Sequence, residues 1–240
     1  MRLTDFKVLS FDCYGTLIDW ETGILEALAA MRREDRAGRS RESVLASFAR
    51  HESAQEAETP GMLYPEVLAR VHCRLAAEWG VPSNEAAEQS FGRSVGNWPA
   101  FADSAGALGY LKEFFTLVIL SNVDRVSFAA SNRRLGVAFD AVYTAEEIGS
   151  YKPDLRNFRY MLEALAGHGH EPSAILHVAQ SLYHDHLPAN AIGLASAWID
   201  RRHGAEGAGA TPPPAAAAHW DFRFESLAEL VEAHRAARSA

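Results

Sequence analysis

Five polar residues stand well apart in the chain, each close to an apolar segment, and their side chains together suit covalent hydrolysis. Asp12 ends the run FKVLSFD, Ser121 and Asn122 follow TLVIL, Lys152 opens YKPD, and Asp185 comes soon after AILHVA. A carboxylate can attack an electrophilic carbon, and a nearby lysine favours its ionised form. A second carboxylate can activate water. This chemistry requires a fold that brings the five side chains together.

The apolar segments beside these residues predict short buried strands. We expect strands at residues 6–11, 116–120, 141–143, 174–179 and 195–199, with helices at 106–114, 126–135, 154–165 and 187–192. Such alternation predicts a parallel sheet covered on both faces, which is a doubly wound α/β fold. Ligands of these folds bind at the carboxyl ends of the strands. Lys152 is expected to begin a helix, with Pro153 in its first turn.

Residues 18–92 differ in character, because their apolar positions follow helical spacing and no segment reads as a strand. We therefore predict a core domain formed by residues 1–17 and 93–240, and a helical cap domain, residues 18–92, inserted after the first strand. Residues 203–219 are rich in Gly, Ala and Pro and are expected to form a surface loop. A final amphipathic helix is expected after that loop.

Composition narrows the class of protein. The chain has 240 residues, 48% of them hydrophobic, and a net charge of −8, as in ordinary globular proteins. Its Lys and Arg form no dense basic run, so nucleic acid is not an expected partner. No segment approaches 18 uncharged apolar residues, so a membrane span is not expected either. The two cysteines, Cys13 and Cys73, are expected to be reduced, and with no visible signal peptide a cytoplasmic location is expected.

Asp12 with Thr16, then Ser121, Lys152 and Asp185, resembles the four motifs of the haloacid dehalogenase superfamily. Within it, the segment DCYGTLIDW is similar to that of the type II 2-haloacid dehalogenases, in which Tyr-Gly-Thr follows the nucleophile. The resemblance implies a Rossmann-like core with an inserted helical cap. It also implies hydrolysis of short 2-haloacids to 2-hydroxy acids with release of halide, and it suggests a homodimer.

Two positions of this sequence favour a dehalogenase over a phosphatase. Phosphatases of the superfamily carry a second Asp two residues after the nucleophile, where this chain has Tyr14. A phenol with a pKa of about 10 is a poor acid at neutral pH, but a departing halide needs no proton. Metal-dependent relatives carry an acid where this chain has Gln180. We therefore expect no metal and no cofactor, although Asp12 and Asp185 leave a Mg²⁺ site open.

The resemblance also implies a role for each candidate residue. Asp12 forms the ester, and Lys152 keeps the Asp12 carboxylate ionised and directed at the substrate. Asp185 with Ser181 positions the hydrolytic water. Substrate or halide contacts are expected from Tyr14, Thr16, Ser121, Asn122, Arg41, Arg50, Trp98 and Phe158. Arg41 and Arg50 are alternatives for the cap arginine that family members place near the halide.

Several alternatives stay open at the level of sequence. The rival functions are a phosphatase that forms a phospho-aspartate on Asp12, and a superfamily member that binds ligand with little turnover. Ser181 and Asp185 are four residues apart, whereas the family motif has a spacing of three between its last Asn and Asp. Strand-end Ser, Asn and Asp are also common turn formers. His184 and His186 flank Asp185 and could bind a transition metal, but no further ligand cluster accompanies them.

Overall fold

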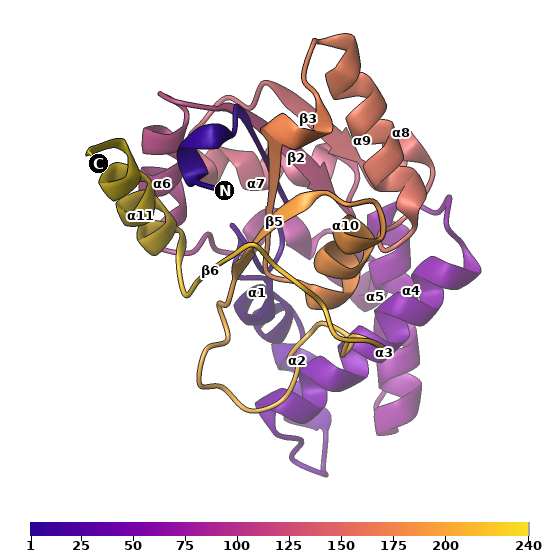
Figure 1. Ribbon diagram of the computed structural model, residues 1–240. Coiled ribbons are helices and arrows are strands. Elements are labelled where there is room, and N and C mark those ends of the chain that lie inside the picture. Colours follow the sequence, from indigo (N-terminus) through magenta and orange to yellow (C-terminus); the bar gives the residue numbers. More distant parts are fainter. Residues whose placement is uncertain (240) are drawn as a thin grey trace.

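A single six-stranded parallel sheet forms the centre of the molecule in a computed structural model, which describes residues 1–239 (Figure 1). The strands lie in the order β3-β2-β1-β4-β5-β6. Their bounds are Val8–Phe11 for β1, Thr116–Ser121 for β2, Ala141–Thr144 for β3, Ile175–Ala179 for β4, Ala195–Ile199 for β5 and Phe222–Phe224 for β6. Strand β1 therefore lies between β2 and β4, and the predicted doubly wound α/β fold is confirmed.

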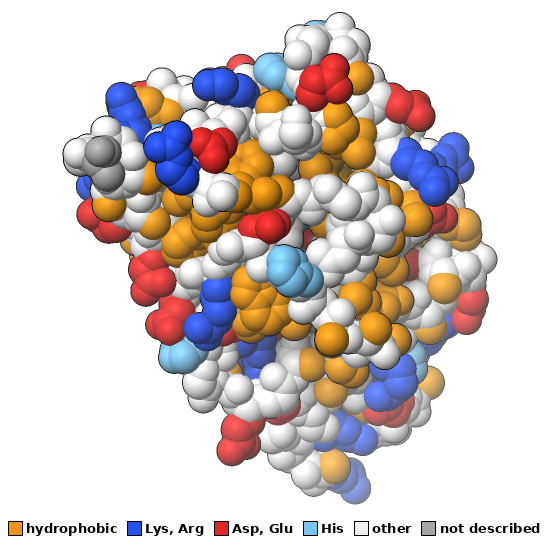
Figure 2. Space-filling model, viewed as in Figure 1, with side chains coloured by type: hydrophobic (Ala, Val, Ile, Leu, Met, Phe, Trp, Pro, Cys, Tyr) orange, Lys and Arg blue, Asp and Glu red, His pale blue; other side chains and the backbone are white. Residues whose placement is uncertain are grey.

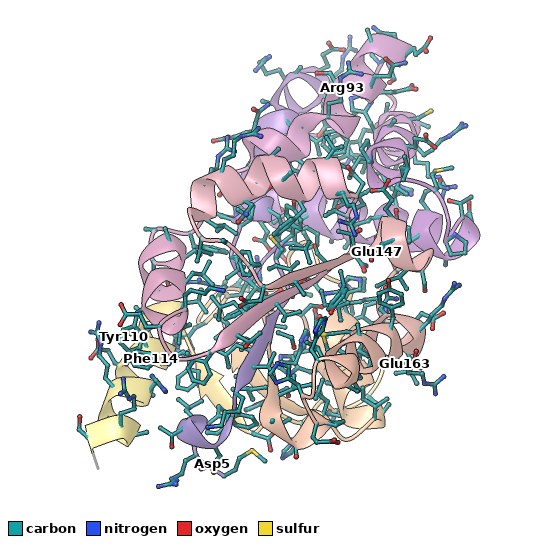
Figure 3. The ribbon with its side chains drawn as sticks, turned by 90° about the horizontal axis from the view of Figure 1, so that it is seen from above. Asp5, Arg93, Tyr110, Phe114, Glu147 and Glu163 are labelled. Atoms are coloured by element: carbon teal, nitrogen blue, oxygen red, sulfur yellow. The ribbon has the colours of Figure 1, made fainter. Side chains whose placement is uncertain are left out.

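The central strands are buried on both faces, because successive side chains point to opposite sides. Leu9 and Phe11 of β1 join one large apolar cluster, and Val8 joins a second cluster on the other face. Helices α6 (Ser104–Leu111), α7 (Arg125–Leu135) and α11 (Leu227–Ser239) pack on the first face, and α9 (Leu155–Gly167) and α10 (Leu187–Ala191) on the second. Figure 3 shows Tyr110 and Phe114 on one flank of the sheet and Glu163 on the other.

Five helices precede residue 93 in the segment that connects β1 to β2: α1 (Trp20–Ala27), α2 (Ala29–Glu34), α3 (Arg41–Glu58), α4 (Tyr64–Trp79) and α5 (Glu85–Gly92). The predicted helical character of this segment is confirmed, and we call these five helices the cap. The Ser40 hydroxyl accepts a hydrogen bond from Ser43 N at the start of α3, and Gly80 ends α4 in a left-handed conformation. Helix α1 meets the core closely, because a Cβ on Gly23 would lie 2.2 Å from the Trp98 ring. The division into two domains at residues 17 and 92 stays a prediction.

The structure differs from the sequence-based expectation in several elements. Within the segment predicted to be helical, residues 18–92, the chain is broken at Leu28 between α1 and α2, and the short edge strand β6 was not expected. Helix α9 begins at Leu155, because the Asp154 side chain accepts a hydrogen bond from Arg156 N and caps it. Lys152 and Pro153 thus precede the helix instead of opening it. Helix α8 (Ala145–Ile148) is a single additional turn before them.

The surface in Figure 2 shows acidic and basic side chains interspersed over this face, with apolar side chains between them. The loop at residues 203–219 contains no helix or strand, as expected. Among the helices of residues 1–239, none has the length and apolar character that crossing a membrane requires.

Candidate active site

Asp12 stands directly after β1, where the chain turns away from the sheet. Gly15 makes this turn with a φ of +93°, a conformation that residues with a Cβ rarely adopt. Leu17 N and Ile18 N both donate hydrogen bonds to Cys13 O, at 2.8 and 2.9 Å, and close the turn. The Asp12 carboxylate is thereby held at the carboxyl end of the sheet, with its side chain buried.

Lys152 is the cation that compensates this buried carboxylate. Its Nζ donates to Asp12 Oδ1 at 2.9 Å, to Asp185 Oδ1 at 2.7 Å and to the backbone oxygen of Leu120 at 2.9 Å. An ammonium group has three N–H donors, so all of them are used. Burial alone would lower the pKa of Lys152, but Asp12 and Asp185 outweigh burial and raise it. Lys152 is therefore charged and has no donor left for a ligand.

Thr16 holds the other oxygen of the nucleophile. Its hydroxyl donates to Asp12 Oδ2 at 2.7 Å and accepts a hydrogen bond from Gln180 N at 2.9 Å. Burial raises the pKa of Asp12, while Lys152 and the Thr16 hydroxyl act in the opposite direction. The two donors thus favour the ionised, nucleophilic form of a carboxylate that burial disfavours.

Asn122 positions Lys152 through its backbone. Asn122 Oδ1 accepts from Lys152 N at 2.7 Å, and Asn122 Nδ2 donates to Lys152 O at 3.0 Å. The second N–H of the Asn122 amide points toward Glu56, and Asn122 Nδ2 lies 3.4 and 3.5 Å from the two carboxylate oxygens of Glu56. Asn122 therefore clamps the end of β2 to the turn that carries Lys152. Its contact with a halide stays a prediction.

Asp185 lies in a π-helical turn, Leu182–His186. Such turns hold one residue more than an α-helical turn and are frequent at functional sites. Burial acts to raise the pKa of Asp185, but Lys152 and His177 overcome it and hold that pKa well below its usual range. His177 Nε2 donates to Asp185 Oδ1 at 2.9 Å, and in the neutral ring Nδ1 accepts from the Ser10 hydroxyl at 2.9 Å. Asp185 is thus ionised at neutral pH.

Ser181 and His184 complete this turn. The Ser181 hydroxyl caps it by accepting from His184 N at 2.9 Å, and it also lies 3.1 Å from His184 Nδ1. Burial lowers the pKa of His184 to about 4, so its imidazole is neutral at physiological pH. Within residues 1–239, His184 Nε2 and Asp185 Oδ2 are buried and have no hydrogen-bond partner. Asp185 Oδ2 can accept a hydrogen bond from a small molecule, and His184 Nε2 donates or accepts one according to which ring nitrogen carries the proton.

Tyr14 occupies the position at which related phosphatases carry an acid. Its hydroxyl lies 2.9 Å from the Ser131 hydroxyl, and its ring packs edge-on against Trp98 at 5.6 Å between centroids. Burial raises the pKa of Tyr14 well above its ordinary value. The phenol is therefore neutral and a weak acid. Trp98 supports Tyr14 from behind, and its indole N–H donates to the Ser94 hydroxyl at 3.2 Å.

These residues line a small cavity of about 30 Å³ between the sheet and the cap. Its lining residues are Asp12, Tyr14, Trp20, Glu52, Glu56, Tyr64, Asn122, Val123, Lys152, Ser181, His184 and Asp185. Since a water molecule needs about 10–15 Å³ of such volume, the cavity holds about two waters. The structure thus brings all four predicted catalytic residues to one cavity, together with Tyr14 and Asn122.

The cap contributes acids to this cavity. Glu52 and Glu56 of α3 are both buried, and Tyr64 of α4 donates a hydrogen bond to Glu52 Oε1. Burial raises the pKa of Glu52 to about 8, and burial with repulsion from Glu52 raises that of Glu56 well above its ordinary value. The cap side of the cavity is therefore acidic in composition.

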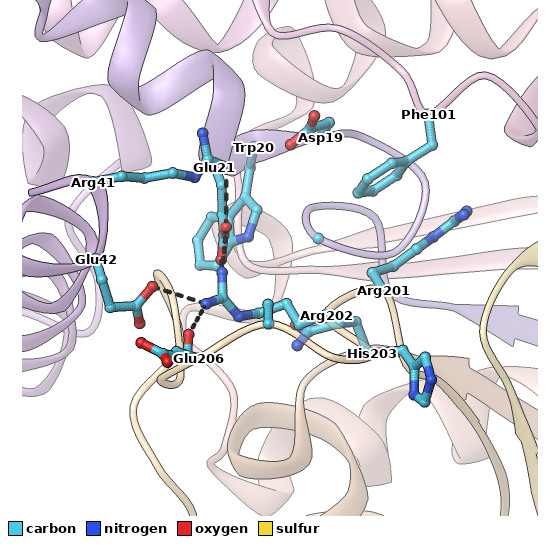
Figure 4. Close-up of a pocket in the computed structure, with 13 residues that line it drawn as sticks. Asp19, Trp20, Glu21, Arg41, Glu42, Phe101, Arg201, Arg202, His203 and Glu206 are labelled. Carbon is cyan, nitrogen blue, oxygen red and sulfur yellow. Dashed lines mark hydrogen bonds and ion pairs between the residues drawn. The ribbon is translucent and has the colours of Figure 1, made fainter.

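The two candidate cap arginines lie outside this cavity. Arg50 pairs with Glu78, and its side chain is 58% exposed. Arg41 lies 3.3 Å from Glu21 and lines a separate, larger cavity of about 420 Å³. Figure 4 shows this cavity, in which Arg202 extends between Glu21 and Glu42 from the loop that follows β5.

Four further predicted contacts are also absent from the cavity lining: Thr16 and Trp98, described above, and Ser121 and Phe158. Ser121 is buried at the end of β2, and its hydroxyl has no partner within the described chain. Phe158 is fully buried in α9, where its ring packs edge-on against His177 at 5.1 Å between centroids. Phe158 thus supports the imidazole that holds Asp185.

The sequence-based predictions missed His177, Ser10, Glu52, Glu56 and Tyr64. His177 had a signal, since it is a polar residue within the apolar strand AILHVA, and buried polar groups need partners. Glu52 and Glu56 had none, because acids on one turn of a helix usually face solvent. Within residues 1–239 no group of three or more His, Cys, Asp or Glu side chains is arranged to hold a metal ion.

Solved structures with the same fold include an L-2-haloacid dehalogenase from Xanthobacter autotrophicus with chloropropionic acid covalently bound. It shares 19% identity with this chain, covers 96% of it and 98% of its own length, and has a TM-score of 0.75. A defluorinating L-2-haloacid dehalogenase has 21% identity and a TM-score of 0.77, covering 98% of this chain and 99% of its own. A HAD-hydrolase structure from Bacillus subtilis, bound to magnesium, has 19% identity and a TM-score of 0.75, with coverage of 98% and 100%.

At these identities the likeness shows the fold, which dehalogenases share with a magnesium-bound hydrolase. No curated protein matches the chain. The family model for haloacid dehalogenase-like hydrolases matches residues 6–193, well over half of the sequence. Its span runs from β1 through the turn that carries Asp185. The chain belongs to the haloacid dehalogenase-like hydrolase family.

Proposed function

We propose that this hydrolase removes halide from short 2-haloacids and forms 2-hydroxy acids through an ester on Asp12, without a metal ion. The observation that carries the proposal is the surroundings of Asp12. Its carboxylate is aimed into a small cavity by Lys152 and Thr16, while Tyr14 offers only a weakly acidic, hydrogen-bonded phenol. This arrangement suits a leaving group that departs without a proton.

In the first step, an Asp12 oxygen forms a bond to the halogen-bearing carbon, and the carbon–halogen bond breaks with both electrons leaving on the halide. Lys152 maintains the charge and direction of the nucleophile. Asp12 loses its negative charge in the ester, so Lys152 then compensates Asp185 alone. No proton is transferred in this step.

In the second step, water attacks the acyl carbon of the ester. Asp185 Oδ2, an unpartnered acceptor of the cavity wall, can bind this water and take up one of its protons. Asp185 is aimed by Lys152 and His177. The bond between the acyl carbon and the substrate-derived oxygen then breaks, and that oxygen takes the proton from Asp185 to give the 2-hydroxy acid. The other proton of the water passes to solvent, which regenerates the Asp12 carboxylate.

The test is halide release from C2 to C4 2-haloacids, fluoroacetate included, with EDTA present. We expect release that added Mg²⁺ does not increase, and none from Asp12→Asn. A single turnover in ¹⁸O-water should label the Asp12 carboxylate of the wild type. Phosphate release that requires Mg²⁺, with no halide release, would identify a phosphatase instead. A protein that binds haloacid but incorporates no label would be a binding protein.

A further inference from the structure

The cap presents two acids to a cavity that has no free cation. Glu52 and Glu56 are only 3% and 6% exposed. The one cation in the cavity wall, Lys152, already uses its three donors on Asp12, Asp185 and Leu120 O. Arg41 and Arg50 pair with Glu21 and Glu78 elsewhere, and within residues 1–239 neither Glu52 nor Glu56 forms an ion pair with an arginine.

Charge balance indicates that these acids carry protons in the folded protein. Asp12 and Asp185 together already exceed the single charge of Lys152 by one. Two more ionised carboxylates, buried without a cation, would be very unfavourable, whereas neutral carboxyls are tolerated. Burial raises the pKa of Glu52 to about 8, and that of Glu56 also lies well above its usual value.

The titratable and charged groups around the pair come from several elements. Tyr64 faces Glu52 from α4, and Tyr151 and Lys152 approach from the turn before α9. Asp124, the cap of α7, and the cavity residues Asp12, His184 and Asp185 lie on the core side. Among these, Lys152 is the one fixed cation, and it lowers the pKa of Glu56 less than burial and Glu52 raise it.

Within the pair, Glu56 is the less constrained carboxyl. Glu52 accepts a hydrogen bond from Tyr64, whereas Glu56 has only the long contacts of 3.4 and 3.5 Å with the Asn122 amide. The remaining Asn122 polar atoms are committed to the Lys152 backbone. An acid proton on Glu56 is therefore free to point into the cavity.

We propose that the protonated Glu56 carboxyl, with Glu52 beside it, donates a hydrogen bond from the cap to the departing halide. This inference rests on the proposed function and assigns the cap-side contact of the leaving group. As Asp12 bonds to carbon, the halide leaves with the bonding electrons and accepts a hydrogen bond from Glu56. The proton stays on Glu56, so the step balances without acid catalysis.

The identity of the halide determines how much this donor matters. Fluoride is the poorest leaving group among the halides and the strongest hydrogen-bond acceptor. A neutral carboxyl donor therefore assists carbon–fluorine cleavage more than carbon–chlorine cleavage. The proposed specificity is for small 2-haloacids with a fluorine or chlorine substituent.

The experiment compares halide release from fluoroacetate and chloroacetate across neutral and alkaline pH. Wild-type activity is expected to fall as pH rises through the pKa of the glutamate pair, because ionised Glu56 repels the halide. Glu56→Gln keeps an N–H donor that does not ionise, so this alkaline decline should disappear. Glu56→Leu removes the donor and should lower fluoride release at least about tenfold more than chloride release.

Two further variants separate this role from a structural one. Tyr64→Phe removes a hydrogen bond that lowers the pKa of Glu52, so the alkaline decline should shift to higher pH. Glu58→Gln is the matched control, because Glu58 lies on the same helix but is exposed and pairs with Arg74. It should leave both the rate and the pH profile unchanged.

A second readout is independent of turnover. Titration of the free protein with fluoride, followed by ¹⁹F NMR, should show binding that weakens as the glutamates ionise, and weaker binding by Glu56→Leu. Such binding without halide release from any haloacid would contradict the proposed function but support the Glu56 contact. An alkaline decline that persists in Glu56→Gln, or equal losses of fluoride and chloride release in Glu56→Leu, would overturn the inference.

Discussion

At the scale of single residues, Lys152 determines the electrostatics of the site. One buried ammonium group bridges Asp12, the proposed nucleophile, and Asp185, the proposed base, and is anchored to Leu120 O. Lys152 contacts both carboxylates. In the proposed mechanism it therefore stabilises Asp185 while Asp12 loses its charge in the ester, and Asp12 while Asp185 takes up a proton. Asn122 fixes the backbone of Lys152, so the position of this cation depends on the junction between β2 and its following loop.

Thr16 offers a sharp test of how the nucleophile is held. Thr16→Val keeps the shape of the side chain but removes the donor to Asp12 and the acceptor for Gln180 N. We expect a loss of about 1–3 kcal/mol in the free energy of unfolding, because buried polar groups lose their partners. Halide release should fall at least about tenfold, since the carboxylate is less firmly aimed.

Thr16→Ser is the matched control, because it retains the hydroxyl and both hydrogen bonds. Urea unfolding and steady-state halide release measure the two effects. Equal activity of the Val and Ser variants would contradict a role for the hydroxyl in aiming Asp12.

At the scale of elements, the loop after β5 links the core to the cap. Arg202 Nη1 donates to Glu21 of α1, and Nη2 donates to Glu42 of α3. The same two carboxylates accept hydrogen bonds from Gly209 N at 2.7 Å and Ala210 N at 3.2 Å. A Cβ on Gly209 would lie 1.9 Å from Glu21 Oε1, so this close approach requires glycine.

Arg202→Met should loosen this link. Glu21 and Glu42 would lose their shared cation, and we expect a cost of about 1.5–3 kcal/mol in the free energy of unfolding. Hydrogen exchange at Gly209 and Ala210 should become faster, because their acceptors are no longer fixed. Arg74→Met, which breaks a more exposed pair with Glu58, should cost less than about 1 kcal/mol. Unchanged exchange in Arg202→Met would show that the backbone alone holds the loop.

At the scale of the whole molecule, the fold was the most predictable level. Apolar runs such as TLVIL bury both faces of a strand, and their alternation with helices leaves few topologies. The convergence of Asp12, Lys152, Ser181 and Asp185 on one cavity followed from that topology. The direction of the cap side chains did not follow from the topology, because Arg41 and Arg50 pair with nearby carboxylates whose positions depend on tertiary packing. A homodimer and a cytoplasmic location also stay predictions.

The buried ionisable groups together predict how the stability of the whole molecule depends on pH. Glu52 has a pKa of about 8 in the folded protein and an ordinary value of 4.5, so the folded state retains a proton that the unfolded chain has lost. Its contribution to stability is present at low pH and is lost as pH rises through about 8. Burial lowers the pKa values of His184 and His186 to about 4, and their opposite contribution is complete above their ordinary value of 6.5.

Between pH 6.5 and about 8 the glutamates therefore dominate. The free energy of unfolding should fall by about 1.4 kcal/mol per pH unit for each such group. Urea unfolding at several pH values measures this slope, and Glu52→Gln should reduce it. A slope in Glu52→Gln that equals that of the wild type would show that Glu52 is ionised in the folded protein.

The size of the cavity has a consequence for the order of events in a catalytic cycle. A space of about 30 Å³ holds about two waters, so once the proposed ester stands on Asp12, little room is left for both a halide ion and the hydrolytic water. Under the proposed mechanism, halide is therefore expected to depart before the ester is hydrolysed. Free halide in the medium should then act as a product inhibitor that prolongs the lifetime of the ester.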